Sequence, residues 1–86
     1  MLEQRLHSGP VEREQVVFCL RELRAARAHV QKARYDTSLR WKRDSLRAEL
    51  LTALEGYAAA INQLGAPVPH RLRMEIDLYR GLQKRA

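Results

Sequence analysis

The chain has little of several residue types, and each shortage excludes a class of structure. One cysteine, Cys19, among 86 residues leaves no second thiol for an internal disulfide or a cysteine-based zinc site. It also favours a reducing compartment, so we expect a cytoplasmic protein. No apolar run approaches the ~20 residues of a membrane-spanning helix, and the N-terminus does not resemble a signal peptide. Strand formers are scarce, with five Val, two Ile and two Thr.

Residue patterns that would indicate catalysis are also missing. The histidines His7, His29 and His70 lie in different segments, and none has the i, i+4 partner that binds a metal on a helix. Four glycines form no phosphate loop, and no serine occupies a nucleophile-elbow context. The carboxylates alternate with arginines, as in Arg40 and Asp44, which is typical of surface ion pairing. We therefore expect neither an enzyme nor a cofactor or metal site.

Helix formers dominate, with thirteen Leu, eleven Ala and thirteen Arg. Polar or Gly/Pro-containing breaks at 8–10, 36–38 and 65–69 divide the chain. They predict helices over about 11–35, 39–64 and 70–84, and a short amphipathic piece at 2–7. One of Asp36, Thr37 and Ser38 would cap the start of the second helix, and Gly65 would cap its end. The predicted fold is all-α, a single small domain over 1–86.

Apolar residues recur at helical spacing in both long helices, which predicts their buried faces. The first stripe contains Val16, Cys19, Leu20, Leu23, Ala26, Val30 and Ala33. The second contains Leu39, Leu46, Leu50, Ala53, Leu54, Tyr57, Ile61 and Leu64. A three-residue hinge forces the two helices to lie antiparallel, as a helical hairpin with coiled-coil-like packing.

Some apolar side chains lie off these stripes, namely Val17, Phe18, Trp41, Leu51 and Ala58. Two arrangements could accommodate them. The third helix could cover them in a three-helix bundle, through a face carrying Leu72, Ile76 and Tyr79 and a neighbouring face carrying Met74, Leu78 and Leu82. Alternatively, part of this surface stays free for a partner.

The net charge of +6, from 16 basic and 10 acidic residues, invites a nucleic-acid interpretation. The segment 36–64 is neutral, however, and only Trp41 stands among basic neighbours as a base-stacking aromatic would. We therefore expect no nucleic-acid partner. A small basic nucleic-acid-binding module and a self-associating helical bundle remain the alternative functions.

The order of several segments resembles a known family. Met-Leu-Glu-Gln-Arg-Leu-His-Ser opens the chain, and Leu-Arg-Glu-Leu-Arg-Ala-Ala-Arg follows at 20–27. After the hinge come Ala-Leu-Glu-Gly at 53–56 and Ile-Asn-Gln-Leu at 61–64. This succession, over roughly residues 2–64, is similar to the small co-chaperones of type III secretion needle subunits, of the YscE/PscE/SsaE type.

The resemblance implies a non-enzymatic helical hairpin of the bacterial cytoplasm. Such a protein binds and stabilises a larger TPR-like chaperone, and the two hold the needle subunit in a heterotrimer before export. We expect the partner-binding residues on the second helix and at one aromatic of the first: Phe18, Leu46, Leu50, Leu54, Tyr57, Ile61 and Leu64.

Overall fold

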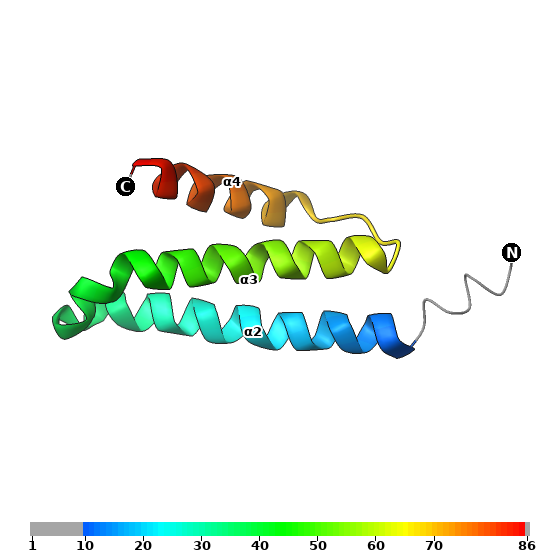
Figure 1. The fold of residues 1–86 in the computed structure, drawn as a ribbon, viewed down its shortest axis with the longest axis horizontal. Coiled ribbons are helices and arrows are strands. Elements are labelled where there is room, and N and C mark those ends of the chain that lie inside the picture. The colour runs from blue at the N-terminus through cyan, green and yellow to red at the C-terminus, as the bar shows by residue number, and fades with distance from the viewer. Residues whose placement is uncertain (1–9, 86) are drawn as a thin grey trace, which may run out of the picture.

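A computed structural model describes residues 10–85 of the chain (Figure 1). The elements are the α-helix α2 (Pro10–Tyr35), the 3-10 helix η1 (Thr37–Lys42), and the α-helices α3 (Arg43–Gln63) and α4 (His70–Arg85). No strand occurs within 10–85, so the all-α prediction is confirmed. The amphipathic piece expected at 2–7 lies outside the described residues.

The helices α2 and α3 lie side by side and antiparallel, as expected of a hairpin (Figure 1). The helix α4 returns along α3, so that its C-terminal end lies near the hinge end of the hairpin. It packs mainly on α3, and it contacts α2 only slightly. The result is an elongated molecule of 53 × 21 × 16 Å.

The start of the second α-helix differs from the expectation. The chain passes through η1 and enters α3 at Arg43 rather than at Leu39. A 3-10 helix rises about 2.0 Å per residue, so six residues cover ~12 Å, comparable with the 8–10 Å between packed helix axes. We infer that the tighter helix carries the chain across the hinge. The change of helix type also alters the i, i+4 register, and Arg40 forms no ion pair with Asp44 within the described chain.

The core lies where the two helical stripes meet. Leu23 and Ala26 of α2 and Leu50, Leu51 and Leu54 of α3 are buried in one cluster. Alanines at this seam let the two backbones approach closely. The remaining buried hydrophobic residues are Ala33, Ala60, Ile61, Leu72 and Ile76.

The position of the third helix answers a question that the sequence left open. Leu72 and Ile76 are buried against the hairpin, and Tyr79 packs on the same cluster, so α4 folds on the hairpin itself. Arg80 bonds Glu55 of α3 at 2.7 Å, and Arg27 of α2 bonds Glu75 at 2.6 Å. These pairs are partly exposed and stabilise the fold only modestly.

Gly65 ends α3 as predicted. Its φ of 89° is the only positive φ among the described residues. The Gly65 N–H donates to the Asn62 carbonyl at 3.0 Å, and the Ala66 N–H donates to the Ile61 carbonyl at 3.2 Å. These two bonds define a Schellman motif, which closes a helix with a residue in the left-handed region.

Two glycine-to-alanine substitutions should therefore have opposite effects. Gly65→Ala should lower the free energy of unfolding by about 1–2 kcal/mol, because an L-residue is strained at this φ. Gly56→Ala, inside α3 with open space around it, should raise it by about 0.5–1 kcal/mol. Urea unfolding followed by circular dichroism measures both, and equal effects would contradict the cap assignment.

Leu54 has 0% exposure and tests the seam between α2 and α3. Leu54→Ala should lower the free energy of unfolding by roughly 2–5 kcal/mol, the range for a deleted core leucine. Thr52→Ala, at an exposed position of the same helix, is the matched control and should change it by less than about 0.5 kcal/mol. A loss for Leu54→Ala no larger than for the control would show that the seam is not packed.

Candidate interaction surfaces

The first candidate surface lies on the side of α2 that faces away from the core. Phe18 is 59% exposed and Val17 is 49% exposed. At about 100° per residue, Phe18 lies roughly 140° around the helix from the buried Leu23, so neither α3 nor α4 can cover it. Together with the side chains that line the same shallow hollow, it forms what we call the outer patch of α2: Arg13, Glu14, Val17, Phe18 and Arg21.

The other predicted partner-binding residues lie in a different environment. Leu50, Leu54 and Ile61 are buried, and they hold the hairpin together. Tyr57 is partly buried and packs on the core. Leu46 and Leu64 are also partly buried. Phe18 is thus the one residue of the seven predicted that is mostly exposed. It lies on α2, whereas the other six belong to α3 and its C-terminal cap.

Sequence reasoning missed a second surface at the hinge end of the molecule. A cleft of about 210 Å³ lies between the last turns of α2, the first turns of α3 and the last turns of α4. We call it the arginine cleft, and its lining residues are Val30, Ala33, Arg34, Arg43, Leu46, Arg47, Tyr79 and Leu82. The only sequence signal for it was the number of basic residues near the hinge.

The hinge between these helices is fixed by a short capping arrangement. Ser38 donates from its hydroxyl to Asp36 Oδ1 at 2.6 Å and from its backbone N–H to the same atom at 3.0 Å. Both bonds favour the ionised carboxylate, the hydroxyl bond most, and they lower the pKa of Asp36 below its ordinary value. Because this pKa is lowered on folding, its contribution to stability is present at neutral pH and is lost as the pH falls through it.

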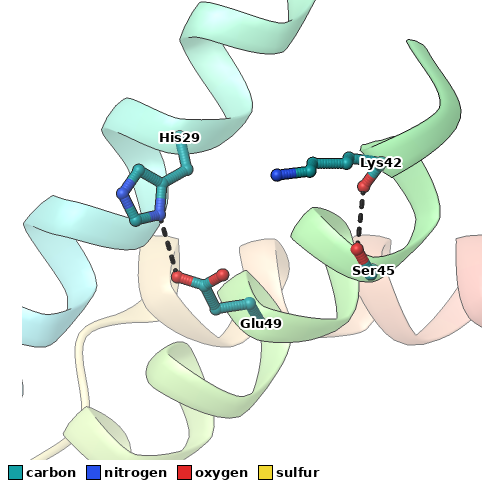
Figure 2. A network of polar contacts seen from close by, with 4 residues as sticks. All are labelled: His29, Lys42, Ser45 and Glu49. Atoms are coloured by element: carbon teal, nitrogen blue, oxygen red, sulfur yellow. Dashed lines mark hydrogen bonds and ion pairs between the residues drawn. The ribbon is translucent and has the colours of Figure 1, made fainter. Parts of the chain in front are cut away.

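Near the hinge, one polar contact joins α2 to α3 and another lies within the chain between η1 and α3 (Figure 2). His29 Nδ1 lies 3.0 Å from Glu49 Oε1, and the Ser45 hydroxyl donates to the Lys42 carbonyl at 3.1 Å. The Lys42 ammonium lies 5.1 Å from the centre of the exposed Trp41 ring, within cation–π range. These contacts lie at the surface, where such pairs contribute little to stability.

Groups suited to metal binding do not converge in the part of the chain that is described. No cluster of three His, Cys, Asp or Glu side chains occurs within 10–85. Cys19 is partly buried on the apolar stripe, and its Sγ lies 3.6 Å from Gln15 Nε2. None of the helices within 10–85 has the length and apolar character needed to cross a membrane.

Comparison with known proteins gives no match to a family model, to a curated protein or to a solved structure. The similarity to the needle-subunit co-chaperones therefore depends on the segments of residues 2–64 quoted above. Any function has to be argued from the surfaces that the fold displays.

Proposed function

We propose that this protein is a non-enzymatic co-chaperone of the bacterial cytoplasm. It binds a larger TPR-like chaperone by helix packing, and the two hold a type III secretion needle subunit before export. The observation that supports the proposal most is the outer patch of α2. It places an aromatic side chain and a neighbouring valine in the open, on a helix whose opposite face is packed.

The chemistry of the patch suits a helical partner. Phe18 and Val17 provide the apolar contact, while Arg13, Glu14 and Arg21 surround them with both signs of charge. An apolar centre with a polar rim is the usual arrangement of a protein–protein interface. The mixed charges suit a protein surface better than a polyanion, which would favour basic residues alone.

The energetics of a chain this small are also consistent with a partner. Stability of 0.05–0.15 kcal/mol per residue amounts to only about 4–13 kcal/mol for such a domain. A partner that binds the folded hairpin, and not the unfolded chain, increases the free energy of unfolding by mass action. In return, the small protein covers apolar surface of the larger chaperone, which is the role proposed here.

The substitution Phe18→Ala tests the proposed interface. It should weaken capture of the candidate TPR-like chaperone by more than ~2 kcal/mol, the usual loss for a central aromatic anchor. The helix content should stay unchanged, because Phe18 lies outside the core. The measurement is co-expression of both proteins, followed by size-exclusion chromatography of the complex and circular dichroism of the variant alone.

Leu78→Ala is the matched control, since Leu78 is 57% exposed on α4 and lies outside the patch. It should co-elute with the chaperone as well as the parent protein does. If the two variants behave alike, the outer patch of α2 is not the interface. If the parent protein leaves the chaperone as insoluble as it is alone, the co-chaperone function is wrong, and light scattering would then test self-association.

A further inference from the structure

The arginine cleft brings together positive charges that form no salt bridge within residues 10–85. Arg34 comes from α2, and Arg43 and Arg47 come from α3, where they are i, i+4 neighbours. Like charges at this spacing destabilise a helix by a few tenths of a kcal/mol. None of the three forms a salt bridge with a carboxylate of the described chain, although Arg27 and Arg80 do so elsewhere.

The neighbouring acidic group does not neutralise the cleft. Asp44 lines an adjoining hollow together with Arg47, Leu82 and Gln83, but it forms no ion pair with Arg47 among the described contacts. Among residues 10–85, no carboxylate lines the arginine cleft itself. Three guanidinium groups around one concavity therefore produce a local positive potential that attracts an anionic ligand.

The apolar part of the cleft lining, which we call its floor, adds a second requirement. It consists of Val30, Ala33 and Leu46 from the hairpin and Tyr79 and Leu82 from α4. These side chains are buried or partly buried, so the concavity is preformed by the packing of three helices. A ligand that fits has an apolar group for the floor and negative groups for the rim.

From this geometry we propose that the arginine cleft binds an acidic peptide segment, in which an aliphatic side chain is flanked by carboxylates. The aliphatic group packs on Val30 and Leu46, and the carboxylates pair with the guanidinium groups. Arginine presents a planar fork of donors that matches a carboxylate in bidentate geometry. Arg34 of the cleft lies 16 residues after Phe18 along α2, or about 24 Å at 1.5 Å per residue. The cleft is therefore separate from the outer patch.

Two other polyanions fit the cleft less well. Single-stranded nucleic acid needs free aromatic faces for its bases beside the groups that bind its phosphates. Tyr79 in the cleft lining is packed on the core, and the exposed rings of Tyr35 and Trp41 do not line the cleft. An anionic membrane favours a convex apolar surface beside the basic residues. The exposed aliphatic side chains lie elsewhere, at Val11, Val17, Met74 and Leu78.

The experiment measures binding of the full chain to a labelled peptide in which each leucine is flanked by glutamates, by fluorescence anisotropy. The parent protein should bind this peptide with an affinity that falls as the salt concentration rises. Replacing the glutamates of the peptide by glutamine should weaken binding, and so should replacing its leucines by glycine. A single-stranded oligonucleotide and anionic phospholipid vesicles serve as competing probes and should bind more weakly than the peptide.

Matched triple variants separate the cleft from net charge. R34Q/R43Q/R47Q should weaken peptide binding by about tenfold or more, since three charge pairs are removed, two of them at the partly buried Arg43 and Arg47. R24Q/R71Q/R73Q removes the same charge from exposed positions outside the cleft and should change binding by less than about threefold. Amide chemical shifts of the parent protein on peptide addition should move most at Ala33, Leu46 and Leu82, whether or not the first variant folds.

Three results would overturn the proposal. Equal loss in both triple variants would indicate attraction to net charge alone. Tighter binding of the oligonucleotide or of the vesicles would assign the cleft to that ligand instead. Shift changes confined to the outer patch of α2 would place the peptide at the other surface. None of these results measures capture of the chaperone through Phe18, so the proposed co-chaperone function keeps its own separate test.

Discussion

The rest of the structure depends on the seam where α2 and α3 pack. Leu23, Leu50 and Leu54 are almost fully removed from water there, and each contributes about 1.5–3 kcal/mol of hydrophobic stabilisation. The helix α4 has no comparable contact with α2, and its buried side chains rest chiefly on α3. Without the seam, neither the surface that α4 covers nor the hinge would exist.

The seam also decides which surfaces remain for binding. Because α4 packs on α3, it leaves the far side of α2 uncovered (Figure 1). Phe18 of α2 is 59% exposed. Because α4 runs back toward the hinge, its last turns close the arginine cleft with Tyr79 and Leu82. One surface is thus apolar with mixed charges, and the other is concave, with three arginines that form no salt bridge to the described part of the chain. They lie at different positions along α2 and suit different ligands.

Much of the fold could be predicted from the sequence, because it depends on short-range patterns. Helical spacing of apolar residues identifies the buried sides of α2 and α3, and Gly65 beside two prolines predicts the end of α3. The exposure of Phe18 also follows from its angle around the helix. The start of α3 was placed too early, because no residue in 37–42 distinguishes a 3-10 turn from an α-helical one.

The arginine cleft could not be predicted for a different reason. Arg34, Arg43 and Arg47 are ordinary surface arginines when each helix is considered alone. They share a concavity only once the register of α2 against α3 and the path of α4 are known. Which face of the hairpin the third helix covers was likewise open, because apolar side chains lie on two neighbouring faces of that helix.

Native-state hydrogen exchange tests the central role of the seam most directly. Amides near Leu23, Ala26, Leu50 and Leu54 should exchange slowest and only through global unfolding, with a matching dependence on denaturant. Amides near Leu72 and Ile76 should exchange through a smaller opening, in which α4 detaches while the hairpin persists. Equal protection of α4 and the seam, or early opening of α3 ahead of α4, would contradict this account.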